Sequence, residues 1–345
     1  MRAWQHTVLS VLLLPFAGFY WGITTFRNWL YQRILKPVRL NAKIISVGNI
    51  TVGGTGKTPF VETIAHYLQN QGKRVVIQSR GYGRRSTGFI TVSDGKDLLV
   101  SPDLAGDEPY LLARKLPGVP VIVGTDRLSA TQQAIERFQP DVVILDDAFQ
   151  HRRITRDLDI VLLDTLRPWG NGRLLPAGPL RETPENINRA GLIVLTRSEN
   201  LEMTSLRLNA LKMQTDIPII TSKHIPIEWA DIHAKKAHTL QYLQHQNLVA
   251  FSGIGNPDSF IKTLNEIEIE PLVTMNFKDH HWYTEKDMVK IKQSAVKSGA
   301  TALVTTEKDG VRLIGLREID LPIYCLRIEC TIDRFELLNQ LLQEP

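Results

Sequence analysis

The sequence has almost no cysteine. Its 345 residues include only two, Cys325 and Cys330, which lie close together near the C-terminal end. Two cysteines supply neither a disulfide framework nor the repeated pairs of a zinc site, and such sparse use suits a reducing compartment. We therefore expect both to be buried strand residues without a part in the chemistry.

Acidic residues are missing from the first 43 positions. This segment holds six basic residues and no Asp or Glu, so it carries +6 while the whole chain carries +5, which leaves −1 on residues 44–345. A basic arm on a nearly neutral body argues against nucleic-acid binding, which needs its basic patch on the folded domain. The basic residues of the arm are Arg2, Arg27, Arg33, Lys36, Arg39 and Lys43.

Charged residues are also missing between Arg2 and Arg27, where TVLSVLLLPFAGFYWGITTF (7–26) stands. A helix of this length can cross a bilayer core, and tryptophan and tyrosine flank the stretch as they do at membrane interfaces. We find no small-residue cleavage site of a signal peptide. Pro15, Gly18 and Gly22 weaken a straight span, so the depth of the expected membrane helix stays open. Because most of the flanking basic residues follow this stretch, we expect the body to lie on the cytoplasmic side of the membrane.

A glycine-rich loop follows a strongly apolar segment. KIISVGNI (43–50) predicts a buried strand, TVGGTGKT (51–58) follows, and the apolar spacing of 60–72 predicts a helix. Strand, loop and helix form the context of a P-loop, in which backbone N–H groups surround phosphates, Lys57 reaches the β- and γ-oxygens and the Thr58 hydroxyl binds Mg²⁺. The general motif has glycine where Thr51 stands. The predicted nucleotide-binding residues are Thr51, Val52, Gly53, Gly54, Thr55, Gly56, Lys57 and Thr58.

A second segment, PDVVILDDAFQHR (140–152), agrees with this interpretation. Its apolar run leads into Asp146 and Asp147, and P-loop enzymes hold the Mg²⁺ shell with a carboxylate at such a strand end. One acid, Asp146, suffices for the metal. The other, Asp147, could orient the first or act on a substrate hydroxyl.

Short apolar runs recur at 75–79, 119–123, 159–165 and 192–196, separated by helix-length segments. This rhythm predicts an α/β fold, with a P-loop NTPase-like, mostly parallel sheet and helices on both faces. Ligands in such folds bind at the carboxyl ends of the strands. Arginines follow several of these runs and are expected near one phosphate-rich site: Arg80, Arg84, Arg85, Arg127 and Arg173.

Strand-like runs resume at 247–257 after a polar stretch. We therefore divide the chain into a hydrophobic, basic, membrane-associated arm (1–40), a P-loop lobe (41–205) and a smaller C-terminal α/β lobe (206–345). The P-loop would then face a cleft between the two lobes, and closure of that cleft would exclude water.

A P-loop alone does not identify the reaction that a protein catalyses. The Asn-Lys-x-Asp guanine reader of regulatory GTPases is absent, because TRSE (196–199) stands at the corresponding place. A membrane-attached ATPase or GTPase acting on a protein partner remains the alternative, although nothing marks an obligate protein partner. A kinase needs a group that takes the acceptor proton, and the candidates are Asp107, at an expected helix start, and the cluster Asp279, His280 and His281.

Seven segments together resemble the tetraacyldisaccharide 4′-kinase family of lipid A biosynthesis, over nearly the whole chain and in order. They are TVGGTGKTP, RGYGR, GDEP, DDAFQHR, LLPAGPLRE (174–182), FKDHHWYT and TTEKD (305–309), behind a hydrophobic basic arm.

The resemblance implies transfer of the γ-phosphate of ATP to the 4′-hydroxyl of a tetraacylated glucosamine disaccharide 1-phosphate at the inner membrane. By motif position, Lys57 and Thr58 would serve ATP and Mg²⁺, and Asp146 would hold Mg²⁺. Asp107 would be the base, paired with His280, or with His281 if the other ring is used. Whether Asp107 or Asp147 takes the proton stays open. Residues expected near the substrate or nucleotide are Arg80, Arg127, Arg181 and Glu182.

Overall fold

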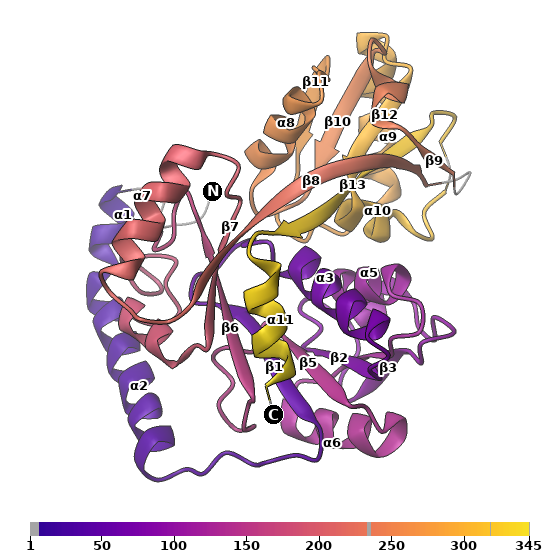
Figure 1. The fold of residues 1–345 in the computed structure, drawn as a ribbon. Helices are drawn as coiled ribbons and strands as arrows, with labels where there is room; N and C mark the ends of the chain where they lie inside the picture. Colours follow the sequence, from indigo (N-terminus) through magenta and orange to yellow (C-terminus); the bar gives the residue numbers. More distant parts are fainter. Residues whose placement is uncertain (1–6, 233–235, 318, 345) are drawn as a thin grey trace.

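The strands of the computed structural model form one mixed sheet (Figure 1). The structure describes residues 7–232, 236–317 and 319–344. Within them the strand order is β11-β10-β12-β13-β8-β7-β6-β1-β5-β2-β4-β3, with β9 paired to β8. Most neighbours are parallel, and the antiparallel pairs are β3 with β4, β8 with β13 and β8 with β9. The expected α/β class with a mostly parallel sheet is confirmed.

The P-loop part of the sheet is buried on both faces, which is why its strands read as continuous apolar runs. Ile45 and Val47 of β1 pack under α3, α5 and α11, whereas Ile44 packs on the opposite face with α6. The strands are β1 (Lys43–Asn49), β2 (Val75–Ser79), β3 (Ile90–Ser93), β4 (Val121–Val123), β5 (Val142–Asp146), β6 (Leu158–Asp164) and β7 (Leu192–Thr196). The helices are α3 (Lys57–Asn70), α4 (Pro102–Ala105), α5 (Asp107–Lys115), α6 (Arg127–Phe138), η2 (Pro184–Arg189) and α7 (Leu201–Lys212).

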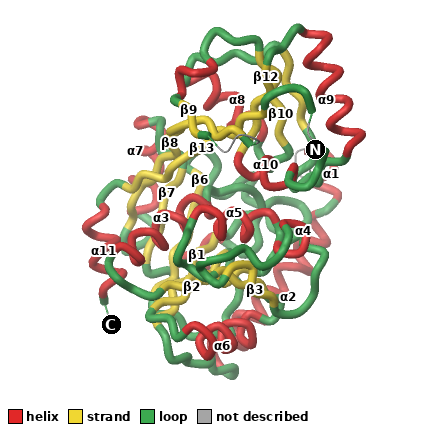
Figure 2. Tube along the Cα trace, turned by 90° about the vertical axis from the view of Figure 1, so that its right-hand side faces the viewer, coloured by secondary structure: helices red, strands yellow, loops and turns green. Residues whose placement is uncertain are grey.

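Two long strands carry the sheet from this part into the next. β8 (Ile219–Asp231) is parallel to β7 at its beginning and antiparallel to β13 (Ile323–Ile332) along most of its length. Figure 2 shows the two strands between the P-loop part and the C-terminal part. Both cysteines lie on β13, where they are free and buried, as expected.

The C-terminal part repeats the α/β pattern on a smaller scale. Its elements are β9 (Ala237–His238), η3 (Leu240–Leu243), β10 (Leu248–Ser252), α8 (Pro257–Glu266), β11 (Val273–Asn276), α9 (Glu285–Ser298), β12 (Ala302–Thr306) and α10 (Glu307–Leu313). The last helix, α11 (Phe335–Gln343), returns to the P-loop part, where Leu338 and Leu342 join its core. The predicted lobe boundary at residue 206 falls inside α7, and the division into lobes stays a prediction.

The N-terminal segment forms α1 (Thr7–Leu12) and α2 (Leu14–Arg33) along one edge of the P-loop part (Figure 1). Ala17, Thr24 and Asn28 of α2 are buried against the body. Among the described residues no helix combines the length and the apolar character needed to cross a membrane. Arg2, which we counted in the basic arm, lies outside the described residues.

Candidate active site

The glycine loop joins β1 to α3, as its sequence predicts. The last residue of β1, Asn49, donates from its side chain to the Thr55 hydroxyl at 2.9 Å and so braces the loop from inside. Gly56 has a φ of +77°, and a Cβ there would lie 2.7 Å from the His224 ring. Only glycine both adopts this positive φ without strain and leaves room for the His224 ring. Lys57 follows as the first residue of α3, so the glycine loop leads directly into a helix N-terminus, whose backbone N–H groups favour phosphate.

The two carboxylates at the end of β5 have different surroundings. Asp146 is buried and accepts a hydrogen bond from the Ser79 hydroxyl at 2.9 Å. Asp147 has a φ of +49° and lies next to cations: its carboxylate is 2.9 Å from Arg181 and 3.6 Å from Lys57. Burial alone raises the pKa of Asp147, but the charges of Lys57, Arg181 and Arg127 hold it well below its usual range. Asp147 is therefore a firmly ionised partner of the P-loop lysine.

Asp107 and His280, 173 residues apart, form a hydrogen-bonded pair. Asp107 begins α5 and is 3% exposed, and His280 Nδ1 lies 2.9 Å from its Oδ2. Burial raises the pKa of Asp107, but the hydrogen bond and charge of His280 and the charge of Arg312 lower it below the ordinary value. For His280, burial lowers the pKa, and Asp107 reverses this and raises it. The second ring, His281, contacts Asp287 at 3.1 Å and not Asp107.

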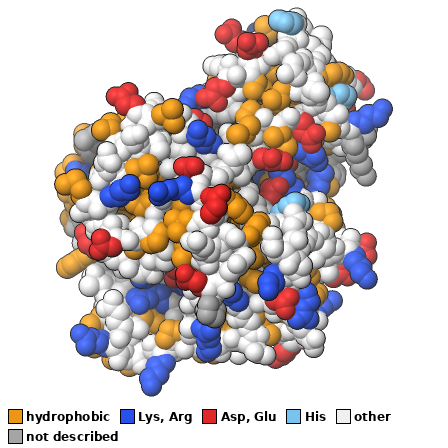
Figure 3. All heavy atoms as spheres, in the orientation of Figure 1, with side chains coloured by type: hydrophobic (Ala, Val, Ile, Leu, Met, Phe, Trp, Pro, Cys, Tyr) orange, Lys and Arg blue, Asp and Glu red, His pale blue; other side chains and the backbone are white. Residues whose placement is uncertain are grey.

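A cavity of about 850 Å³ lies between the two parts of the chain. It is lined by the glycine loop and Asp147 from one side and by His280 and Lys308 from the other. Acidic and basic side chains gather where the two parts meet (Figure 3). The P-loop and His280, the ring of the Asp107–His280 pair, therefore face one cavity.

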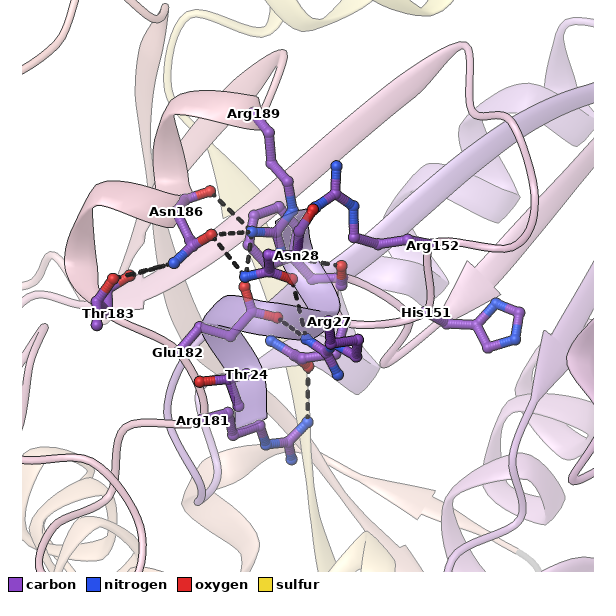
Figure 4. A network of polar contacts seen from close by, with 12 residues as sticks. Thr24, Arg27, Asn28, His151, Arg152, Arg181, Glu182, Thr183, Asn186 and Arg189 are labelled. Atoms are coloured by element: carbon purple, nitrogen blue, oxygen red, sulfur yellow. Dashed lines mark hydrogen bonds and ion pairs between the residues drawn. The ribbon is translucent and has the colours of Figure 1, made fainter. Parts of the chain in front are cut away.

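The four residues expected near the substrate have separate places. Arg181 lines the cavity and pairs with Asp147. Arg127 is buried behind it and donates to the Asp147 carbonyl at 2.8 Å and to the Gln78 side chain at 2.7 Å. Arg80 is exposed and is not among the residues that line the cavity. Glu182 is fully buried and points toward the N-terminal arm (Figure 4).

Glu182 is the centre of a polar network that attaches α2 to the body (Figure 4). Its carboxylate oxygens lie 2.9 Å from Arg27 of α2 and 2.7 Å from Arg189 of η2. Beside them, the Asn28 side chain donates to Asn186 at 3.0 Å. Since Arg181 precedes Glu182 in the chain, the arm is tied directly to a segment that reaches the cavity.

Glu182→Ala is expected to lower the free energy of unfolding by about 3–5 kcal/mol, because it leaves two arginines without their buried partner. Urea unfolding measures the loss. Glu185→Ala is the matched control, because Glu185 lies three residues away and is exposed. Equal unfolding midpoints for the two variants would contradict a buried ionic anchor.

Sequence reasoning missed a set of ion pairs between α5 and α10. Lys115 lies 2.9 Å from Glu307, and Lys308 pairs with Glu108. The segments GDEP and TTEKD contain three of these four residues, but their spacing gave no sign that they face each other. The pairs hold the two parts together beside the cavity.

A cavity that combines a phosphate loop with a buried acid–imidazole pair is suited to pass a phosphate to a hydroxyl acceptor, with that pair available for the proton. The fold and the site together define a P-loop kinase. P-loop kinases act on many different acceptors, and comparison with known proteins identifies the family within this class.

The model of the family described as tetraacyldisaccharide-1-P 4′-kinase matches residues 9–344, and the chain belongs to this family. A tetraacyldisaccharide 4′-kinase of Syntrophus aciditrophicus is 40% identical, over 99% of this chain and 94% of the relative. One of Pelobacter propionicus is 41% identical, over 96% and 91%. The crystal structure of an "apo" form of LpxK from Aquifex aeolicus in complex with ATP is similar with a TM-score of 0.79, 36% identity, and coverage of 97% of this chain and 98% of that one. The resemblance seen in the sequence is confirmed.

Proposed function

We propose that this protein transfers the γ-phosphate of ATP to the 4′-hydroxyl of an acylated glucosamine disaccharide 1-phosphate, which gives the 4′-phosphorylated lipid. Family membership supports the substrate class, and the relative of known structure was solved with ATP. The observation that carries the proposal is that His280, which lines the same cavity as the P-loop, is hydrogen-bonded to the buried Asp107.

In this account the glycine loop and Lys57 bind the phosphates of ATP. Asp147 orients Lys57 and Arg181, which present positive charge to the transferred group. Asp107, paired with His280, accepts the proton of the attacking hydroxyl. His280 lines the cavity, whereas Asp107 is buried and is not among the residues that line it, so the proton of the acceptor reaches Asp107 through the His280 ring.

We place Mg²⁺ at Asp146 and Thr58. Burial raises the pKa of Asp146 to about 6, and the negative charges of Glu108 and Asp147 act in the same direction. A cation relieves this crowding of negative charge. Mg²⁺ bound there would neutralise charge on the phosphate oxygens during transfer.

The donor set fits such an ion. The described residues contain no group of three or more His, Cys, Asp or Glu side chains able to hold a metal by themselves. Mg²⁺ in phosphoryl-transfer sites takes most of its ligands from phosphates and water, with one or two from the protein. One carboxylate and one hydroxyl, both buried beside the glycine loop, match this need.

We also propose that α1 and α2 lie on the surface of the inner membrane, with the catalytic body on its cytoplasmic side. An apolar stripe runs along the helices away from the body at intervals of three and four residues. Its members are all more than half exposed: Leu12, Phe16, Phe19, Ile23 and Phe26. The opposite side of α2 carries the polar network with Glu182. This division of faces is typical of helices that lie in a membrane interface.

Replacing Phe16, Phe19 and Ile23 together with serine is expected to abolish flotation of the protein with anionic phospholipid vesicles, because the variant loses the apolar area that enters the interface. The matched control replaces three exposed apolar residues of the C-terminal part, Leu272, Val289 and Val296, with serine. The control is expected to float like the unmodified protein. Equal flotation of both triple variants would contradict the proposed orientation.

The experiment that tests the function follows γ-labelled ATP in the presence of Mg²⁺ and detergent-dispersed acylated disaccharide 1-phosphate. Label is expected in the lipid. Release of labelled inorganic phosphate at the same rate with and without the lipid would favour a P-loop ATPase that acts on a protein partner. The comparisons do not favour that alternative.

A further inference from the structure

Arg312, on α10, is a buried arginine that none of the roles above includes. Its side chain is 1% exposed, and its Nε, which donates to the Lys308 carbonyl at 3.1 Å, forms an ion pair with Oδ2 of Asp107 at 3.3 Å. A second guanidinium nitrogen, Nη2, lies 3.3 Å from Asp309. The third, Nη1, donates to the backbone carbonyls of Gly253 at 2.9 Å and His281 at 3.2 Å. All three guanidinium nitrogens are therefore used, and none is left for solvent.

These contacts join the two halves of the acid–imidazole pair. Asp107 belongs to the P-loop part, whereas Gly253, which follows β10, and His281, which follows His280 in the chain, belong to the C-terminal part. His280 has a φ of +56°, and its N–H donates to the same Gly253 carbonyl at 3.0 Å. Arg312 thus holds the carboxylate and the loop of its partner ring with a single rigid group.

The other ion pairs between α5 and α10 do not have this arrangement. Lys308 contacts Glu108, and Lys115 contacts Glu307, so neither pair makes a direct contact with Asp107 or His280. Only arginine offers a planar set of donors that serves two carboxylates and two carbonyls at once.

We infer that Arg312 is a positioning residue for phosphoryl transfer, which fixes the Asp107 carboxylate against the His280 loop and opposes proton uptake by the resting pair through its charge. This inference rests on the proposed role of Asp107 as the base.

The positive charge of Arg312 predicts the direction in which the pH–rate profile moves when the charge is removed. The pair accepts the acceptor proton only when it does not already hold an extra one, so activity rises with pH through the pKa of the pair. Arg312 lowers the pKa of Asp107 and adds to the effect of His280. Removing the positive charge raises that pKa, and the acid side of the pH–rate profile moves to higher pH. The other charged groups that face the pair stay in place: Glu108, Lys308 and Asp309 on the helices, and Asp279 on the loop, 3.9 Å from His280 Nε2.

The experiment records pH profiles of kcat and kcat/KM for lipid phosphorylation in the unmodified protein and three variants. Arg312→Gln removes the charge and is expected to move the acid limb of kcat/KM about one pH unit upward. Arg312→Lys keeps the charge but not the fork of donors, so its limb is expected to stay in place while kcat falls about tenfold at unchanged KM. Arg317→Gln, an exposed loss of the same charge five residues away, is expected to change neither.

Circular dichroism checks that each variant is folded, and Arg312→Lys, the gentler change, carries the test if Arg312→Gln does not fold. An unshifted limb in folded Arg312→Gln, or an unchanged kcat in Arg312→Lys, overturns the inference. Asp107→Asn separates the two proposals. If that variant keeps its kcat and acid limb, the base assignment fails and this inference fails with it. If Asp107→Asn loses activity while the Arg312 variants behave like Arg317→Gln, this inference alone fails.

Discussion

Asp107→Asn is expected to lower kcat for lipid phosphorylation by about 10²–10⁴-fold, the usual contribution of a general base. The amide has nearly the shape of the carboxylate and can still accept a hydrogen bond from His280, but it cannot take a proton. The fold and the KM for ATP are therefore expected to change little. Steady-state kinetics with saturating lipid measure the effect.

The matched control is Asp103→Asn, because Asp103 lies four residues earlier on α4 and its side chain is 34% exposed. Its kcat is expected to stay within about twofold of the unmodified protein. Asp147→Asn serves as the alternative that the sequence leaves open. A larger fall in kcat for Asp147→Asn than for Asp107→Asn, with ATP binding unchanged, would transfer the role of base to Asp147.

Lys57→Ala is expected to lower kcat/KM for ATP about 10²–10³-fold, because a positive group aimed at the transferred phosphate is lost from a water-excluded site. The change also leaves Asp147 with one cation fewer, since only Arg181 then remains within 4.0 Å of its carboxylate among the described residues. Initial rates over a range of ATP concentrations measure the loss, and titration with a fluorescent ATP analogue separates binding from turnover.

Lys73→Ala is the matched control for this experiment, because Lys73 is an exposed lysine shortly after the same helix. Its kinetics are expected to equal those of the unmodified protein. A Lys57→Ala variant that keeps more than about a tenth of the unmodified kcat/KM would contradict the assignment of the glycine loop as the ATP site.

The sequence predicts the nucleotide half of the site well, for a local reason. The strand, the glycine loop and Lys57 are contiguous, and Asp146 ends a strand that a parallel sheet places beside β1. The rules that connect these residues to phosphate binding act over a few residues or between neighbouring strands. The strand, the glycine loop and the strand that ends at Asp146 therefore lie in the structure where the sequence predicts them.

The residues expected to act on the acceptor hydroxyl, Asp107 and His280, are far apart in the sequence. Asp107 and His280 meet only because α5 of one part packs beside the loop after β11 of the other, and the pair was expected from the family resemblance and not from spacing. Arg312 was overlooked because nothing near it in the sequence shows that it is buried. Likewise, Glu182 was expected near the substrate, and its partner Arg27 comes from a helix 155 residues earlier. Contacts of this range depend on how the elements pack.

For the N-terminal arm, the sequence predicts contact with a membrane but not which side of the helix faces the protein. Its uncharged run is as long as a membrane span, but one side of α2 is occupied by Thr24, Asn28 and the polar network of Glu182. The length of the run could not show that this side faces protein. Only the exposed stripe is left for lipid, which is why we propose that the helix lies on the membrane.

The central claim is transfer of phosphate to one hydroxyl of a lipid disaccharide. Phosphorus–proton correlation NMR of the product made from ATP and the purified disaccharide 1-phosphate tests it most directly. We predict a new phosphorus signal correlated with the proton at the 4′ carbon, and no such signal from Lys57→Ala. A new phosphate correlated with any other sugar proton, or inorganic phosphate as the sole product, would contradict the account.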